Sequence, residues 1–197
     1  ACNDPNHAEW FTAHYIHTLR TRRVEADKPL ATMMGWQDKR GEREVVLLFG
    51  SNDAEAERIV GEAVEIVAAS IGRIERVSQV YRSEAYGFSS DSEFVNRAAV
   101  VRTGLNAYEV LRRINLIEAM LGRDRGEEQA VREARGERYA SRPIDIDIIF
   151  YGTETFDDSR LTIPYHFLAE RGYALRPVAE VVPDFRHPAL RLTPKEM

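Results

Sequence analysis

Two carboxylates in the C-terminal half have the spacing of a metal site. Asp145 and Asp147 lie within residues 142–150, which read Arg-Pro-Ile-Asp-Ile-Asp-Ile-Ile-Phe. The stretch alternates with period two and is rich in β-branched residues, which predicts a strand. The two carboxylates then share one face, about 7 Å apart along the strand. Hard oxygen ligands at this spacing suit Mg²⁺, which usually completes its shell with water and substrate phosphates.

A plainer interpretation of the same strand is a half-buried strand with two acids on its solvent face, and the strand alone does not decide between them. The loop before it, residues 122–141, is rich in arginine and contains three glycines, which predicts mobility without ligand. Mg²⁺ at the carboxylates and arginines on a movable loop suit transfer of a phosphoryl-type group. Because the loop also carries five acids, a solvated loop of balanced charge is the alternative.

A second group of residues could bind a flat ring. Tyr86 and Phe88 lie in a predicted loop, and Phe94 and Asn96 share one face of the strand that follows. Aromatic rings can sandwich a heterocycle such as a pterin or purine, and an amide offers both a donor and an acceptor. Aromatic residues at the edge of the core are the alternative explanation.

The sequence has no P-loop and no kinase-type glycine loop, so any ATP site has a less common architecture. Gly50, Ser51 and Asn52 end an apolar run and precede an amphipathic segment. Their composition is typical of a cap at the start of a helix. This short stretch is too small to be a phosphate cradle by itself.

Six segments must position these residues. Periodicity predicts, in order, a strand at 45–49, a helix at 54–70, strands at 73–82 and 94–101, a helix at 105–121 and the strand at 142–150. This order predicts an α+β fold, a ferredoxin-like βαββαβ antiparallel sheet with both helices on one face. Asp145 and Asp147 would then lie on the open face. A turn after residue 151 and short helices at 165–171 and 174–182 predict a C-terminal hairpin and short-helix extension.

Residues 1–43 differ from the rest and are interpreted as an N-terminal extension, partly helical or disordered, with residues 44–197 as the main domain. An apolar content of 44% fits a globular core, and the single cysteine, Cys2, excludes a disulfide within the chain. A net charge of −5 argues against general nucleic-acid binding. No apolar run approaches the ~20 residues that span a membrane. We therefore expect a cytoplasmic protein.

Several motifs together resemble the 6-hydroxymethyl-7,8-dihydropterin pyrophosphokinase family. The resemblance runs from about Val45 to Pro183. The segments that carry it, in chain order, are 50–52, 81–83, 94–96, 117–118, 122–123, 142–148, 161–164 and 171–173. Several spaced motifs in the right order are more specific than any one of them.

The resemblance implies an ATP-dependent pterin pyrophosphokinase of folate biosynthesis, in which ATP gives its β,γ-pyrophosphoryl unit to the pterin hydroxymethyl group and leaves as AMP. It implies that Asp145 and Asp147 hold two Mg²⁺ ions. The catalytic residues it implies are Arg123, Arg125, Arg142, Asp145 and Asp147. Those for the pterin are Ser83, Tyr86, Phe94, Asn96 and Tyr173. Those for ATP are Asn115, Glu118, Ile148, Thr162, Tyr165, His166 and Arg171. We expect a monomer whose partners are these two small substrates.

The sequence departs from the family pattern in two places that concern ATP. Tyr165 stands where the family usually has His, and His166 follows it, so either side chain could make that contact. The arginine loop is longer than in short bacterial members, so Arg132, Arg135 and Arg138 carry no assigned role.

Other functions remain open. One is a different Mg²⁺-dependent nucleotidyl or phosphoryl transferase, and another is a non-catalytic pterin- or nucleotide-binding domain. A ferredoxin-like RNA binder fits least, because the aromatic RNA-recognition signature is missing. The joint presence of Asn96, Arg142, Asp145 and Asp147 favours the enzyme, since a binding module does not need both metal ligands.

Overall fold

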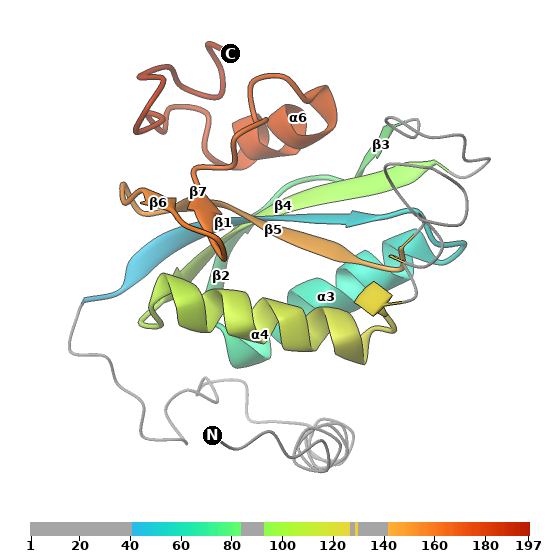
Figure 1. The fold of residues 1–197 in the computed structure, drawn as a ribbon. Helices are drawn as coiled ribbons and strands as arrows, with labels where there is room; N and C mark the ends of the chain where they lie inside the picture. Colours follow the sequence, from blue (N-terminus) through green and yellow to red (C-terminus); the bar gives the residue numbers. More distant parts are fainter. Residues whose placement is uncertain (1–40, 84–92, 127–128, 130–141) are drawn as a thin grey trace.

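The computed structural model describes residues 41–83, 93–126, 129 and 142–197 and shows an α+β fold with an antiparallel sheet (Figure 1). The sheet strands are β1 (Arg43–Ser51), β2 (Arg73–Val77), β3 (Tyr81–Ser83), β4 (Phe94–Thr103) and β5 (Asp145–Tyr151). Their order is β2-β4-β1-β5, with β3 also pairing with β4, and each pair is antiparallel. The predicted class, α+β with an antiparallel sheet, is confirmed.

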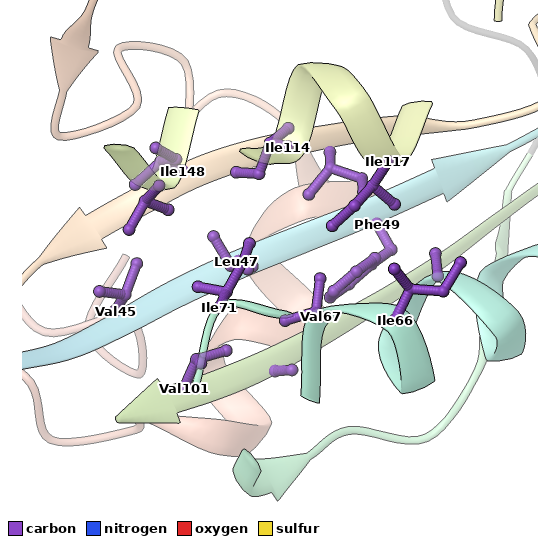
Figure 2. Close-up of a cluster of buried hydrophobic side chains, with 14 of the residues drawn as sticks. Val45, Leu47, Phe49, Ile66, Val67, Ile71, Val101, Ile114, Ile117 and Ile148 are labelled. Carbon is purple, nitrogen blue, oxygen red and sulfur yellow. The ribbon is translucent and has the colours of Figure 1, made fainter. Parts of the chain in front are cut away.

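Two helices, α3 (Ala56–Ser70) and α4 (Ala107–Met120), cover one face of the sheet (Figure 1). Between them and the sheet lies the main core, in which Leu47 and Phe49 of β1 meet Val67 and Ile114 of the helices (Figure 2). These four side chains are at most 1% exposed. The apolar stripes of both helices therefore bury against the sheet as their 3.6-residue period predicts.

A third helix, α6 (Gly172–Val181), packs on the opposite face (Figure 1). Its buried residues Ala174 and Val178 form a second apolar cluster with Val46, Ala98 and Phe150 of the sheet. The prediction that this face is open is therefore wrong over that region. Because both faces of β1 are covered, its sequence is a continuous apolar run rather than an alternating one.

The carboxylate strand alternates as predicted until it reaches a bulge. Ile144, Ile146 and Ile148 belong to the main core, whereas Asp145 and Asp147 are half-buried. The pairing with β1 then shifts, so that Val46 lies opposite Phe150 and Leu47 opposite Ile148. The extra residue, Ile149, lets both Ile149 and Phe150 join the cluster under α6.

Three local predictions were wrong. The strand predicted at 73–82 is divided into β2 and β3, because Ser78 exchanges bonds with Ala98: its N–H donates to the carbonyl (2.9 Å) and its Oγ accepts from the Ala98 N–H (2.9 Å). Residues 165–171 form turns, not a helix. The cap of α3 is Glu55, so Ser51 and Asn52 do not cap it.

A short hairpin of β6 (Phe156–Asp157) and β7 (Thr162–Ile163) follows β5. Tyr108 of α4 donates to Asp158 in its loop (2.6 Å). Residues 1–40 of the predicted N-terminal extension, Tyr86 and most of the arginine loop lie outside the described residues. In the part of the chain that the structure describes, no helix is long and apolar enough to cross a membrane.

Candidate functional site

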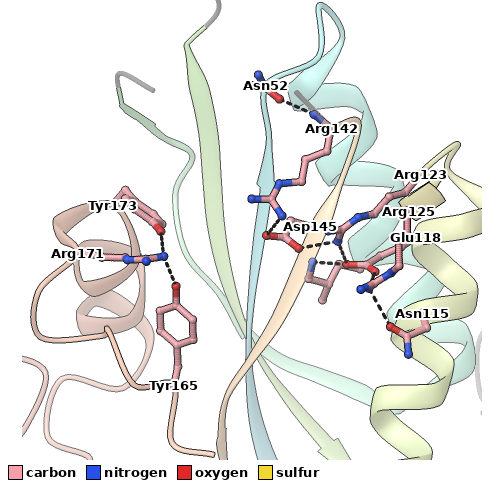
Figure 3. Close-up of polar contacts among 11 residues, drawn as sticks. Asn52, Asn115, Glu118, Arg123, Arg125, Arg142, Asp145, Tyr165, Arg171 and Tyr173 are labelled. Atoms are coloured by element: carbon pink, nitrogen blue, oxygen red, sulfur yellow. Dashed lines mark hydrogen bonds and ion pairs between the residues drawn. The ribbon is translucent and has the colours of Figure 1, made fainter. Parts of the chain in front are cut away.

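The Asp145 carboxylate is held between two arginines. Arg123 Nη1 donates to its Oδ1 (2.6 Å), and Arg142 Nη1 lies 3.1 Å from its Oδ2 (Figure 3). The Arg123 side chain is 6% exposed, so its charge is largely removed from water. These residues, together with Glu118 and Arg125, are called the carboxylate–arginine cluster below. Arginines that face a carboxylate in this way could also face a phosphate.

Glu118 lies near the end of α4 and is the buried acid of this cluster. Its Oε1 accepts from Arg123 Nη1 (2.7 Å) and from the N–H of Ile146 in β5 (2.8 Å). Its Oε2 accepts from Arg125 Nη2, which also donates to Asn115 Oδ1 (3.0 Å). Burial raises the pKa of Glu118, and the charge of Arg123 opposes this rise. Glu118 thus joins the end of α4 to the strand that carries both aspartates.

Asp147 lies on the same strand face as Asp145. Burial, and after it the Asp145 carboxylate, raise the pKa of Asp147 to about 8. A carboxylate pushed this far toward its neutral form lies where a cation would stabilise the charge. Among the described residues no three His, Cys, Asp or Glu side chains come together as a metal site. The two aspartates therefore fit Mg²⁺ only as it binds in many ATP sites, with one or two carboxylates and the rest of its shell from phosphates and water.

A second cluster is built around Arg171, just before α6. Arg171 Nη1 donates to the hydroxyl oxygens of Tyr165 (2.7 Å) and Tyr173 (2.8 Å) (Figure 3). Its guanidinium carbon lies 4.2 Å from the centre of the Phe167 ring. These four residues are called the tyrosine–arginine cluster. Hydroxyl groups and ring faces orient this guanidinium group.

Electrostatics connects Asp147 to the tyrosine–arginine cluster. The pKa of Tyr165 is raised, first by burial and second by the charge of Asp147. Asp147 therefore lies close enough to Tyr165 for its charge to act on the hydroxyl. The phenol stays neutral at physiological pH and keeps its hydrogen-bonding role. Figure 3 shows Tyr165, Arg171 and Tyr173 on one side of β5 and Glu118, Arg123 and Arg125 on the other.

Asn96 is a buried amide on β4, at the edge of the same region. It is 2% exposed, its Nδ2 donates to Ser83 Oγ (3.3 Å), and it lies opposite Gly50 in the sheet. A Cβ atom at Gly50 would lie only 3.2 Å from Asn96 Oδ1. Gly50 therefore leaves space for the Asn96 amide. The sequence pattern predicted Gly50 only as part of a helix cap and did not indicate this role. Phe94, half-buried, lies two residues before Asn96 on β4.

Asn52 is a further residue whose role was missed. It is 2% exposed, and its Oδ1 accepts from the backbone N–H of Arg142 (2.9 Å). The two residues are 90 positions apart, so no local pattern links them. Asn52 fixes the point at which the chain enters the aspartate strand, and with it the start of the Arg142 side chain.

The remaining predicted site residues are spread around these clusters. Asn115 is exposed on α4 beside Arg125, and Thr162 is half-buried in β7. Tyr165 is half-buried and bound to Arg171, whereas its neighbour His166 is exposed. Ile148 is part of the main core and 6% exposed, so it packs under α4. The fold thus brings the charged residues together and leaves His166 at the surface.

Comparison with known proteins identifies a family. A family model described as 7,8-dihydro-6-hydroxymethylpterin-pyrophosphokinase matches residues 46–183. A 2-amino-4-hydroxy-6-hydroxymethyldihydropteridine pyrophosphokinase from Methylorubrum extorquens is 36% identical over 137 residues, 69% of this chain and 80% of that protein. The enzyme of the same name from Aquifex aeolicus is 32% identical over 152 residues, 77% of this chain and 88% of that protein.

Solved structures show the same fold. The crystal structure of Plasmodium falciparum HPPK-DHPS with pteroate superimposes with a TM-score of 0.60 at 16% identity, over 80% of this chain and 42% of that one. The chain thus spans less than half of that protein, and at this identity the likeness concerns the fold alone. The family model, in contrast, matches well over half of the chain, and the resemblance read from the motifs is confirmed: the chain belongs to the 7,8-dihydro-6-hydroxymethylpterin-pyrophosphokinase family.

Proposed function

We propose that the chain transfers the pyrophosphoryl group of ATP to 6-hydroxymethyl-7,8-dihydropterin in folate biosynthesis. The hydroxymethyl oxygen forms a bond to the β-phosphorus, the bond from that phosphorus to the α,β-bridging oxygen breaks, and AMP leaves with the bridging oxygen. The observation that carries this proposal is the meeting of three arginines with Asp145 and Glu118, next to Asp147, in the region that the family model matches.

The arginines bind the phosphates in this proposal. Arg123 and Arg142 already contact one carboxylate with planar guanidinium groups, whose geometry also fits phosphate oxygens. Arg125, 61% exposed, and Arg171, half-buried in the tyrosine–arginine cluster, approach from the two sides of β5. Guanidinium groups held in place before the reaction stabilise charge that develops on the phosphoryl oxygens.

Asp145 and Asp147 would hold two Mg²⁺ ions together with the phosphates. When bound, Mg²⁺ supplies Lewis-acid polarisation of the phosphate under attack and orients the attacking hydroxyl. The raised pKa of Asp147 supports this role, because a cation would relieve the repulsion between the two carboxylates. The aspartates keep their side-by-side position because the Ile side chains that alternate with them on the strand are fixed in the core.

The pterin lies on the Asn96 side. The Asn96 amide reads the edge of the ring, and Ser83 and Tyr86 complete that edge. Phe94 and Tyr173 stack on the two faces of the ring. The hydrogen bond from Asn96 to Ser83 supports this arrangement, since it fixes the orientation of the amide before the ring binds.

The nucleotide is bound by residues on α4, β5 and the segment after β7. We assign contacts to Asn115, Thr162, the backbone of Ile148 and one side chain of the Tyr165–His166 pair. The half-buried position of Tyr165 and its contact with Arg171 favour Tyr165 over the exposed His166 at the position where the family usually has His.

The strand order β2-β4-β1-β5 and the two helices α3 and α4 on one face support a ferredoxin-like βαββαβ core. Residues 44–197 would form the catalytic domain and residues 1–43 an extension to it. The monomeric state and the cytoplasmic location stay predictions.

A single assay tests the function. The protein is incubated with ATP, Mg²⁺ and 6-hydroxymethyl-7,8-dihydropterin, and AMP is measured; a pterin without the hydroxymethyl group serves as control. We expect AMP and pterin diphosphate in equal amounts, and no AMP with the control pterin. Tight binding of both substrates without AMP would instead identify a non-catalytic binding domain.

A further inference from the structure

Glu118 is too deeply enclosed to be a simple nucleotide ligand. Its side chain is 2% exposed, and both carboxylate oxygens already accept hydrogen bonds from the protein. A buried carboxylate is costly unless it is paired and hydrogen-bonded, and the contacts of Glu118 meet that condition. To contact a ribose or base directly, the side chain would have to give up at least one of them.

The partners of Glu118 all belong to the reaction site. Oε1 accepts from Arg123 Nη1, and that Nη1 atom also donates to Asp145. Oε1 accepts a second hydrogen bond from the N–H of Ile146, which lies between the two aspartates. Oε2 binds Arg125, which remains 61% exposed. One carboxylate thus fixes a buried arginine, an exposed arginine and the backbone of β5 relative to one another.

We propose that Glu118 is a positioning residue that holds the guanidinium groups of Arg123 and Arg125 at the aspartate strand for the phosphates of ATP. This inference rests on the proposed function. It assigns Glu118 an action through the arginines in place of the nucleotide contact that the motif resemblance implies.

The exposed Arg125 shows why such a support is needed. A long exposed side chain samples many rotamers, and ordering it at the moment of binding costs conformational entropy. Its bonds to Glu118 and Asn115 restrict the guanidinium group while it still faces solvent. Arg123, in contrast, is buried and shared between Glu118 and Asp145. Glu118 therefore sets the spacing between an exposed arginine and a buried one.

The test compares Glu118→Gln with Glu109→Gln. Glu109 is on the same helix and pairs with Arg112 at the surface (3.1 Å), so it is a matched control for loss of an ion pair from α4. We expect Glu118→Gln to lower kcat roughly tenfold or more, because small displacements of catalytic groups are costly, with KM for the pterin within about twofold. Glu109→Gln should leave both constants unchanged.

A structural readout separates this proposal from the proposed function. The Arg123 Hη signal in NMR should exchange slowly in the unmodified protein, because Nη1 donates to Glu118, and lose this protection in Glu118→Gln. If the unmodified protein makes no AMP, the proposed function fails, whereas the NMR signal still reports on Glu118. An unchanged signal, or a kcat within twofold of the unmodified enzyme, would overturn the positioning role.

A second variant keeps the test decisive if Glu118→Gln does not fold. Arg125→Gln removes an exposed side chain and should fold normally, with kcat lowered at least about fivefold. Where both single variants fold, the double variant should lose less than the product of the two effects, because both changes remove the same contact. Full multiplicativity, or an Arg125→Gln enzyme as active as the unmodified one, would contradict the proposal.

Discussion

The two arginine clusters beside β5 hold their guanidinium groups by different means. In the carboxylate–arginine cluster, Arg123 and Arg142 bind the two side-chain oxygens of Asp145, and Glu118 adds a second acidic side chain. In the tyrosine–arginine cluster, Arg171 binds two phenol oxygens and lies over the Phe167 ring. The carboxylates of the first cluster neutralise the charge of their arginines. In the second cluster, hydroxyl dipoles and a ring face orient the Arg171 guanidinium group.

Because of this difference, we expect the two clusters to have different functions. Arginines bound to Asp145 must share that carboxylate with any metal that enters, so their charge is available to ATP only when the contacts rearrange. Arg171 is oriented by hydroxyl groups and a ring face, and the Tyr165 phenol stays neutral because its pKa is raised. We therefore expect the first cluster to govern turnover and metal binding, and Arg171 of the second cluster to govern affinity for ATP.

The largest effect is expected at Asp147. Asp147→Asn should lower turnover by about 10²-fold or more while the fold is retained, because it removes a metal ligand but keeps the shape of the side chain. AMP release measures the loss, and Asp157→Asn at an exposed position of β6 is the control. AMP production close to that of the unmodified protein would contradict the metal assignment.

A smaller effect should follow from Arg171→Lys. Lysine keeps the charge but cannot reproduce the planar arrangement that reaches both tyrosine hydroxyls and stacks on Phe167. We expect kcat/KM for ATP to fall about tenfold, mainly through KM, since one charge-assisted hydrogen bond contributes about 1.5 kcal/mol. Arg176→Lys, at an exposed position of α6, is the control. A loss confined to kcat would show that the two clusters do the same work.

Arg142→Gln should have opposite effects on metal binding and turnover. Removing this cation from Asp145 should tighten Mg²⁺ binding to the ATP-free protein about fivefold, the effect of roughly 1 kcal/mol of repulsion. Turnover should fall, because a phosphate-binding group is lost. Isothermal titration with Mg²⁺ measures the first effect, with Arg112→Gln on the surface of α4 as control. Weaker Mg²⁺ binding would mean that Arg142 does not compete with the metal.

Mild acid should destabilise the α6 side of the sheet. His187 packs edge-on against Phe150, its Nδ1 accepts from the N–H groups of Ala189 and Leu190, and burial lowers its pKa. The unfolded chain therefore binds this proton more readily, and stability is lost as the pH falls below about 6.5.

Thermal unfolding at pH 7 and pH 5 measures this effect. His187→Asn, which keeps an acceptor, should reduce the acid-induced fall in Tm by about 2 °C. His166→Asn, at an exposed position, is the control and should behave as the unmodified protein does. If His187→Asn leaves the fall in Tm unchanged, the histidine does not contribute to the acid sensitivity of this face.

Much of the fold could be predicted because its signals are local. Alternation in the aspartate strand placed Ile144, Ile146 and Ile148 in the core and both aspartates on the other face. Helical periodicity located α3 and α4 to within two residues at each end. The spaced motifs led to the family. Each of these signals depends on residues that are neighbours in sequence, on one element or in one motif.

Other features could not be predicted, because they depend on residues that meet only after folding. The cover of α6 over the second sheet face and the extra residue Ile149 in β5 follow from packing between distant segments. The break at Ser78 depends on its bonds to Ala98, and periodicity alone extended one strand through it. Local sequence patterns do not show which apolar surface will pack against which.

The sequence by itself determined that Asp145 and Asp147 share a strand face near several arginines, because period-two alternation is an intrinsic property of the strand. Only the tertiary structure decided which group each charge meets. Glu118 reaches Ile146 across 28 residues, and Asn52 reaches Arg142 across 90. The pairing of buried charges depends on where the end of α4 meets β5, and hydrophobic packing over the whole domain sets that meeting point.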